Sequence, residues 1–233
     1  VVGLNYVAPE DHPVSLRDYR THMSFIAELS EKFEGAGQNI ALHAGELTLG
    51  LVPPEHLGWH IREAVEVAGA KRIGHGIDIS YDPNMYQTLQ RMATDDVAVE
   101  INLTSNDVIL GVSGEDHPIS IYLENAVPIT ISTDDEGVSR INLTHEYQRA
   151  VEIFDLSYES IKTISRNAVQ YSFLPGKTLF QNTIDGSFNS ECRKGLPQDL
   201  KDRSTCSSFI LQSEKALAQW QLEKNFNSFE ARF

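Results

Sequence analysis

The chain has 233 residues, of which 41% are hydrophobic and 22% are charged, a composition ordinary for a globular protein. Its formal net charge of −14 argues against a nucleic-acid polymer as partner, because phosphate backbones are bound by Lys and Arg side chains. No apolar run approaches the roughly 20 residues that cross a bilayer, so we expect no membrane partner either.

The first part of the chain alternates short apolar runs with longer amphipathic ones. This pattern predicts a buried strand over Val1–Tyr6 and a helix over Leu16–Phe33 that Ser15 caps. It then predicts a strand over Asn39–His43, a helix over Glu55–Ala68 and a short strand over Arg72–His75. His56 and His60 lie four residues apart in the second helix, which favours a solvated helix face over a metal site.

The remainder of the chain continues the alternation and then becomes helical. The predicted elements are a helix over Pro83–Ala93, a strand over Val97–Asn102, a helix over Ile119–Asn125 and a strand over Pro128–Thr133. Two helices follow, over Thr144–Phe154 and Tyr158–Tyr171. Beyond them, Gly176–Thr205 is polar and irregular, and Ser208–Phe229 is expected to form an amphipathic helix.

Such alternation predicts a parallel sheet with helical crossovers, in either a doubly wound sheet or a barrel. A doubly wound sheet carries a Gly-rich phosphate loop after its first strand, whereas this chain has Val7-Ala8-Pro9-Glu10 there. Polar residues follow every strand, which favours an α/β fold of the (β/α)8 TIM-type. Five strands are found where eight are needed, so we expect the last five strands of the barrel plus a C-terminal helical tail.

Two domains are therefore expected. Residues 1–175 would form the C-terminal part of the barrel catalytic domain, and residues 176–233 a polar loop and C-terminal helix that pack on the barrel. Cys192 and Cys206 are either free thiols of a cytosolic protein or a disulfide that closes the polar loop. The loop has few apolar residues to hold it together, which favours the disulfide and an oxidising compartment.

Three strand ends carry residues suited to metal-assisted hydrolysis. In His43-Ala44-Gly45-Glu46 the glycine permits a sharp turn that brings Glu46 back over the same site as His43. A carboxyl held there away from water could donate a proton. The alternative is that the His is only structural, hydrogen-bonded to the backbone at the strand end and followed by a glycine turn.

The other two strand ends add an imidazole and a pair of carboxylates. His75 lies between Gly74 and Gly76 and could be a base, an orienting group or a ligand, or simply a solvated loop residue. Asp134 and Asp135 follow the last strand directly. Adjacent carboxylates repel unless one binds a cation and the other hydrogen-bonds a ligand, although a helix cap is the structural alternative.

These motifs resemble the adenosine deaminase family, within the metal-dependent amidohydrolase superfamily. The matching pieces are His-Ala-Gly-Glu at 43–46, Arg-Ile-Gly-His-Gly at 72–76 and Ser-Thr-Asp-Asp at 132–135, supported by 100–106, 117–118 and 142–147. The likeness extends from Val1 to Leu174. Glu10-Asp11 and Ser15–Tyr19 are similar to the secreted, growth-factor-like branch, and the tail with Trp220 to exported bacterial members.

The resemblance implies a role for each matching residue. His43 and Asp134 would be zinc ligands, Glu46 would protonate purine N1, and His75 would orient or deprotonate the zinc-bound water. Asp135 would hold the N7 side of the purine, with further substrate contacts at Ala8 and Gly45. The implied reaction is hydrolytic deamination of adenosine, or deoxyadenosine, with inosine and ammonia as the products from adenosine.

The sequence also departs from the family pattern. The His-x-His of the first barrel strand is absent, so two further His ligands are expected on an N-terminal segment or separate chain that completes the barrel. This chain alone should hold zinc weakly and be inactive. Ala8 stands in Asn5-Tyr6-Val7-Ala8 where the family has Asp-Leu-x-Gly, and Glu136 replaces the usual Pro.

Two alternatives stay open: a deaminase of another aminopurine such as adenine or AMP on the same fold, and a non-catalytic barrel remnant that binds adenosine or a receptor. A homodimer is a further expectation. The resemblance to exported relatives predicts a periplasmic or extracellular location, with the cytoplasm as the alternative.

Overall fold

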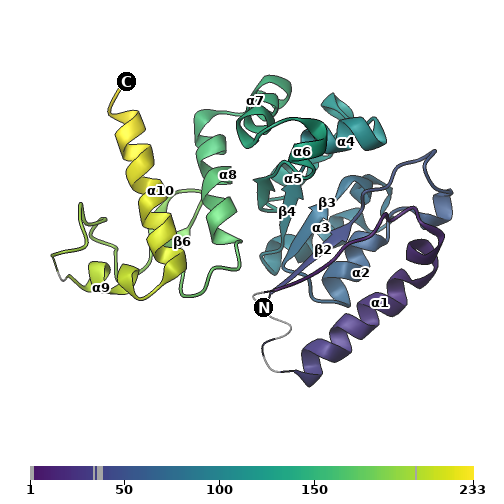
Figure 1. Cartoon of the computed structure of the whole chain (residues 1–233), viewed down its shortest axis with the longest axis horizontal. Coiled ribbons are helices and arrows are strands. Elements are labelled where there is room, and N and C mark those ends of the chain that lie inside the picture. The colour runs from purple at the N-terminus through teal and green to yellow at the C-terminus, as the bar shows by residue number, and fades with distance from the viewer. Residues whose placement is uncertain (1–2, 34, 36–38, 203) are drawn as a thin grey trace. The chain divides into compact units, whose positions relative to one another are not determined.

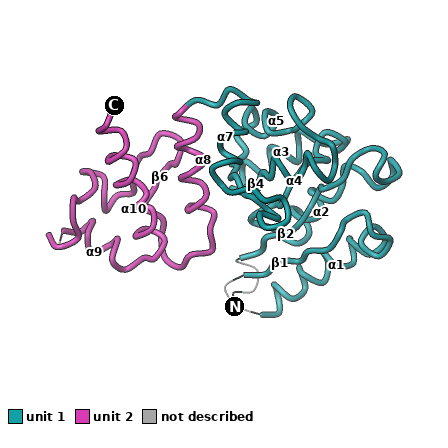
Figure 2. The backbone as a smooth tube through the Cα atoms, turned by 45° about the horizontal axis from the view of Figure 1, so that its top comes forward, with its two compact units in different colours: residues 1–157 teal, residues 158–233 magenta. Residues whose placement is uncertain are grey.

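The computed structural model describes residues 3–33, 35, 39–202 and 204–233 (Figure 1). Val1 and Val2 of the expected first strand, and Arg203 of the expected polar loop, lie outside the described residues. The chain divides into two compact units, residues 1–157 and 158–233 (Figure 2). The division falls earlier than the expected boundary at 175, because the helix that begins at Tyr158 packs within the second unit.

The first unit is built on a five-stranded sheet whose strands follow one another in chain order. They are β1 (Leu4–Tyr6), β2 (Ile40–Ala44), β3 (Arg72–His75), β4 (Ala98–Ile101) and β5 (Ile129–Ile131). Every neighbouring pair is parallel, with Ala44 opposite His75 and Ile101 opposite Ile131. The predicted succession of five parallel strands from a (β/α) barrel is therefore confirmed.

The sheet core comes from the four strands after the first. Ile73, Val99 and Ile101 are completely buried, as is usual for parallel strands that are covered on both faces. The prediction of a buried first strand is wrong, since Leu4 is 36% and Tyr6 49% exposed. The reason is position: β1 is an edge strand that pairs only with β2 among the described residues.

Helices and 3-10 turns connect the strands of the first unit. They are α1 (Pro13–Lys32), η1 (Pro54–His56), α2 (His60–Glu66), η2 (Ile77–Tyr81), α3 (Met85–Thr94), α4 (Leu103–Leu110), η3 (Gly114–Asp116), α5 (Ile119–Glu124), α6 (Glu136–Ser139) and α7 (Leu143–Phe154). Figure 1 shows α1 beside α2, which in turn packs on β2. No helix among the described residues is long and apolar enough to span a bilayer.

Three of these helices differ from the sequence prediction. His12, rather than Ser15, caps α1: its Nδ1 accepts the N–H of Val14. The expected helix over Glu55–Ala68 is divided into η1 and α2. The helix α4 was not predicted, because buried polar side chains on its first turns hide the apolar periodicity that marks an amphipathic helix.

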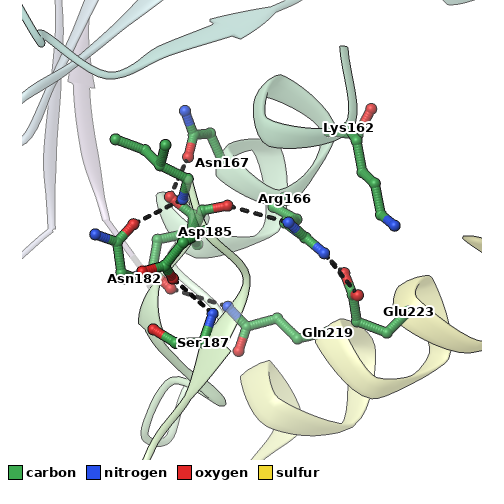
Figure 3. Close-up of polar contacts among 12 residues, drawn as sticks. Lys162, Arg166, Asn167, Asn182, Asp185, Ser187, Gln219 and Glu223 are labelled. Carbon is green, nitrogen blue, oxygen red and sulfur yellow. Dashed lines mark hydrogen bonds and ion pairs between the residues drawn. The ribbon is translucent and has the colours of Figure 1, made fainter. Parts of the chain in front are cut away.

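The second unit contains α8 (Tyr158–Gln170), a hairpin of β6 (Phe180–Asn182) and β7 (Ser187–Phe188), α9 (Thr205–Leu211) and α10 (Glu214–Glu230). Figure 3 shows Arg166 of α8 directed at Glu223 of α10, which it contacts through two hydrogen bonds of 2.8 and 2.9 Å. The expected single helix over Ser208–Phe229 is wrong. The chain breaks at Ser213, whose Oγ caps α10 by accepting the N–H of Ala216.

A disulfide joins Cys192 and Cys206, as the polar loop favoured. Both cysteines are buried in a small core that also contains Leu179, Ile210 and Trp220. The bond closes a loop with a sequence separation of 14 residues. In a unit whose core is this small, a cross-link that restricts the unfolded chain contributes a large share of stability.

We expect the double variant Cys192→Ala and Cys206→Ala to lower the free energy of unfolding of the second unit by about 2–4 kcal/mol, because the unfolded chain gains loop entropy. Urea denaturation followed by the fluorescence of Trp220 measures this, in a background where Trp59 is replaced by Phe. The reductant dithiothreitol should destabilise the parent and leave the double variant unchanged. Equal stability of the oxidised parent and the variant would contradict the expectation.

Candidate active site

The carboxyl ends of β2, β3 and β5 bring the candidate residues to one edge of the sheet. His43 lies near the end of β2, His75 is the last residue of β3, and Asp134 follows β5 by three residues. Because the strands are parallel, their ends meet on the same side, which is where (β/α) barrels place their active sites.

His43 is held by carboxylates at both ring nitrogens. Its Nδ1 lies 2.6 Å from Glu10 Oε1, and its Nε2 lies 3.1 Å from Glu46 Oε2. Glu10 also accepts the backbone N–H groups of Gly45 and Glu46, at 2.8 and 3.1 Å. This one buried carboxylate therefore fixes both the His43 ring and the turn that follows β2.

The turn itself requires glycine. Gly45 has a φ of +84°, and a Cβ placed there would lie 2.7 Å from Asp78 Oδ1 and 2.9 Å from Ile61 Cδ1. The left-handed turn returns the chain so that the Glu46 carboxylate lies beside His43. That is the arrangement expected from the His-Ala-Gly-Glu spacing.

His75 lies next to His43, with ring centroids 4.4 Å apart. Its Nδ1 is 3.3 Å from Glu46 Oε1 and its Nε2 is 3.9 Å from Asp134 Oδ2. Ser105 donates its hydroxyl to Asp134 Oδ2 at 2.7 Å and so holds that carboxylate toward the imidazole. Four of the expected residues thus form one cluster.

Within that cluster, His43, Glu46 and His75 offer ligand atoms that all lie within 4.8 Å of one another. Two imidazoles and a carboxylate are a donor set that suits zinc and other first-row divalent ions. Asp134 lies at the edge of this group, 3.9 Å from His75. The residues present therefore fit a metal ion.

Ala8 and Asp135 lie outside the cluster. Ala8 is exposed in the loop between β1 and α1. Asp135 is exposed at the N-terminus of α6, where its backbone oxygen accepts from Val138 and Ser139. For the residues described, no contact joins the Asp135 carboxylate to His43 or His75. Their expected roles with substrate remain predictions.

Burial and neighbouring charges oppose each other at His43 and Glu10, whereas burial and the charge of His43 act in the same direction at His75. Burial lowers the pKa of His43, but its hydrogen bonds with Glu10 and Glu46 outweigh this and raise the pKa to about 10. Burial likewise raises the pKa of Glu10, yet the hydrogen bond and charge of His43 bring that pKa below its ordinary value. Burial and the charge of His43 together lower the pKa of His75.

Sequence reasoning missed Glu10 as a functional residue and gave no role to Ser105, Asn106 or His117. Glu10 served as evidence against a phosphate loop and for the likeness to the secreted branch, although its place shortly after a predicted strand end was an available signal. Ser105, Asn106 and His117 lie in segments that supported the resemblance. All four are buried or hydrogen-bonded against the cluster.

His60 corrects the expected solvated helix face. It is fully buried at the start of α2, where it stacks on Trp59 at 3.8 Å and meets the edge of Tyr19 at 4.5 Å. Its Nδ1 lies 4.0 Å from Asp78 Oδ2, and burial lowers the pKa of His60 to about 4. Burial, together with the charge of Glu10, raises the pKa of Asp78 to about 7.

Parallel strands with imidazole and carboxylate side chains gathered at their carboxyl ends are the arrangement in which metal-dependent hydrolases of the barrel class hold their active sites. The profile of the adenosine deaminase family matches residues 1–184. The chain belongs to the adenosine deaminase family.

Individual relatives agree with this assignment. The chain is 35% identical over 139 residues to an adenosine deaminase of Clostridium perfringens, which covers 59% of this chain and 39% of that protein. It is 34% identical over 135 residues to an adenosine deaminase of Vibrio vulnificus, covering 56% and 38%. The chain thus matches about two fifths of the length of these relatives.

Solved structures share the fold. An adenine deaminase from Arthrobacter aurescens matches with a TM-score of 0.57 and 21% identity, covering 75% of this chain and 48% of that one. An amidohydrolase from Burkholderia ambifaria, solved with bound Zn, matches with a TM-score of 0.53 and 18% identity, covering 75% and 44%.

We expect Glu10→Gln to weaken metal binding by the intact protein about 10- to 100-fold, because an amide cannot replace the carboxylate that orients His43. Competition titration with a chromophoric zinc chelator measures the affinity. Asp11→Asn is the matched control, since Asp11 is exposed next to Glu10. Equal affinities of the Gln variant and the parent would remove Glu10 from the metal site.

We also expect stability to depend on the protonation of Asp78. Its folded-state pKa of about 7 lies above the ordinary value of 3.8, so the folded chain keeps a proton that the unfolded chain releases between these values. The free energy of unfolding therefore falls as pH rises through this range, by at most about 1.4 kcal/mol per pH unit. Asp78→Asn should remove that decline in urea denaturation series, whereas Asp116→Asn on the exposed surface should retain it.

Proposed function

We propose that the protein containing this chain is a zinc-dependent deaminase that hydrolyses adenosine or deoxyadenosine and releases ammonia. The observation that carries the proposal is the cluster of His43, Glu46 and His75, half-buried to buried, at the carboxyl edge of the sheet in a member of the adenosine deaminase family. A protein that only bound a nucleoside would have no need of two imidazoles and a carboxylate within 4.8 Å of one another.

The metal would be held by His43 and Asp134, with two further His ligands from the segment or chain that completes the barrel. Glu10 supports this role for His43, because its bond to Nδ1 orients the ring so that Nε2 faces the cluster, where it lies 3.1 Å from Glu46 Oε2. When bound, zinc lowers the pKa of a coordinated water to about 7 and so makes it a nucleophile at neutral pH.

Glu46 would protonate purine N1 as the C6 carbon is attacked. Its Oε1 is buried and has no hydrogen-bond partner among the described residues, although it lies 3.3 Å from His75 Nδ1. A buried carboxyl oxygen without a partner is suited to exchange a proton with a bound ligand. Gly45 and Ala8 would lie along the purine, and Asp135 would contact its N7 side.

His75 would act on the attacking water from beside the metal. It is buried, and its Nε2 faces Asp134, the expected ligand. Proton transfer and water orientation are both open to an imidazole in this position.

Adenosine is favoured over a purine nucleotide by charge. An AMP deaminase needs cations near the ribose phosphate, and Arg72, which opens the Arg-Ile-Gly-His-Gly motif, pairs with Glu100 at 2.5 Å. Adenine and AMP deaminases on the same fold are the alternatives that substrate comparison tests.

The disulfide between Cys192 and Cys206 supports an exported location, since such bonds persist in oxidising compartments. The partner expected from the sequence is the segment or chain that supplies the remaining strands of the barrel. Its strands would pair with the edges of β1 and β5.

We expect the intact protein to convert adenosine to inosine, followed by the loss of adenine absorbance, and Glu46→Gln to reduce kcat by about 10²- to 10⁴-fold through loss of the proton donor. Adenine and AMP are assayed in parallel. Glu55→Gln, in the exposed turn η1, is the control and should retain activity.

Metal analysis by mass spectrometry accompanies these assays and should show about one zinc per subunit in the parent and in Glu46→Gln. Full activity of Glu46→Gln would exclude Glu46 as the proton donor. A parent that binds adenosine without turnover and without metal would instead support the non-catalytic alternative.

A further inference from the structure

A chain of buried hydrogen bonds reaches His75 from behind the site. Asn106 Nδ2 lies 3.0 Å from His75 Nδ1, and Asn106 Oδ1 lies 3.2 Å from His117 Nε2. At the far end the backbone N–H of Ile119 donates to His117 Nδ1 at 3.2 Å. The three side chains are each at most 3% exposed, so water does not compete for these bonds.

The bond from the Ile119 backbone N–H determines which atom donates and which accepts in the other hydrogen bonds of this series. A backbone N–H can only donate, so His117 Nδ1 is an acceptor and carries no proton. A neutral imidazole then has its proton on Nε2, which donates to Asn106 Oδ1. Because Asn106 Oδ1 accepts the bond from His117, the group that Asn106 directs at His75 Nδ1 is its amide N–H.

We propose that Asn106 and His117 are positioning residues that fix His75 in the tautomer with its proton on Nε2. This inference rests on the proposed function for its catalytic meaning, but the tautomer itself is a property of the folded chain. The source of the constraint is a backbone amide at the start of α5, so the proton position on His75 is set by the fold.

Two further observations agree with this direction. Burial, together with the charge of Arg149, lowers the pKa of His117 to about 4, so His117 stays neutral near pH 7 with one donor nitrogen. A second amide, Asn102 Nδ2, also faces His75 Nδ1, at 3.5 Å. Two amide donors directed at Nδ1 favour the form in which that nitrogen is an acceptor, and Glu46 Oε1, 3.3 Å from the same nitrogen, then receives no hydrogen bond from it.

The fixed tautomer limits what His75 can do in the reaction. Its Nδ1 accepts the amide N–H of Asn106. Its Nε2 bears the proton and faces Asp134, the expected ligand, at 3.9 Å. His75 therefore acts on the attacking water or a developing oxyanion as a hydrogen-bond donor, and it does not accept a proton at Nε2.

The first test measures the tautomer directly, without any substrate. The intact protein is labelled with ¹⁵N-histidine, and two-bond ¹H–¹⁵N correlation spectra are recorded at neutral pH. The His75 signals are identified by their loss in His75→Gln. We expect the chemical shift of Nδ1 to be that of an unprotonated nitrogen and the shift of Nε2 that of a protonated one. The reverse pattern, or two protonated nitrogens, would overturn the proposal.

The second test reverses the constraint. Asn106→Asp keeps the shape of the side chain but replaces the N–H donor with an acceptor, so the His75 proton should move to Nδ1. If the proposed function holds, kcat should fall about 10²-fold or more with little change in KM, since the lost interaction acts in the transition state. Asn125→Asp, where the amide donates to the Ile121 carbonyl within the same helix end, is the matched control and should retain activity.

Variants at His117 distinguish its hydrogen bond to Asn106 from its contribution to packing. His117→Gln retains an N–H that can donate to Asn106 Oδ1, whereas His117→Leu fills the space without a donor. We expect kcat and the His75 spectrum to be closer to the parent in the Gln variant than in the Leu variant. Equal loss in both, with an unchanged His75 tautomer, would show that His117 is only structural. If the parent deaminates no aminopurine, the proposed function fails while the spectra still decide the tautomer.

Discussion

The bond between Glu10 and His43 is the interaction on which the candidate site depends. It joins the loop after β1 to the end of β2, two segments 33 residues apart. The same carboxylate accepts hydrogen bonds from the backbone N–H groups of Gly45 and Glu46. A buried carboxylate is stable only with such partners, because burial alone penalises its charge. The ring of His43, the turn at Gly45 and the position of Glu46 thus share one anchor.

The conformations at the strand ends are unusual and occur together. Gly45, His75 and Asp134 all have positive φ, at 84°, 71° and 51°. For His and Asp this conformation is held by the surroundings: the His75 ring by Asn106 and the Asp134 carboxylate by Ser105. The chain turns left-handed where it leaves the sheet, so side chains from separate strands converge over the same small volume.

The sequence predicts the sheet well and the supporting residues poorly. Strands such as Val97–Asn102 are short, mostly apolar runs rich in β-branched residues. His43, Glu46 and His75 lie in short motifs at the ends of such strands, so the local pattern is sufficient to predict both. Glu10, Asn106 and His117 act through contacts across 33, 31 and 11 residues, which periodicity does not reveal. The burial of His60 likewise depends on tertiary packing. Trp59 and Tyr19 enclose its side chain, whereas its spacing from His56 in the sequence predicts an exposed helix face.

The outer edge of β1 has a consequence for handling the protein. Leu4 and Tyr6 are exposed along a strand with a single neighbour among the described residues, and Val7 beyond them is 62% exposed. Unpaired amides and carbonyls beside apolar side chains are a template for adding further strands. Recombinant production of these 233 residues by themselves therefore invites intermolecular strand addition and precipitation, which co-expression with a complementary segment would suppress.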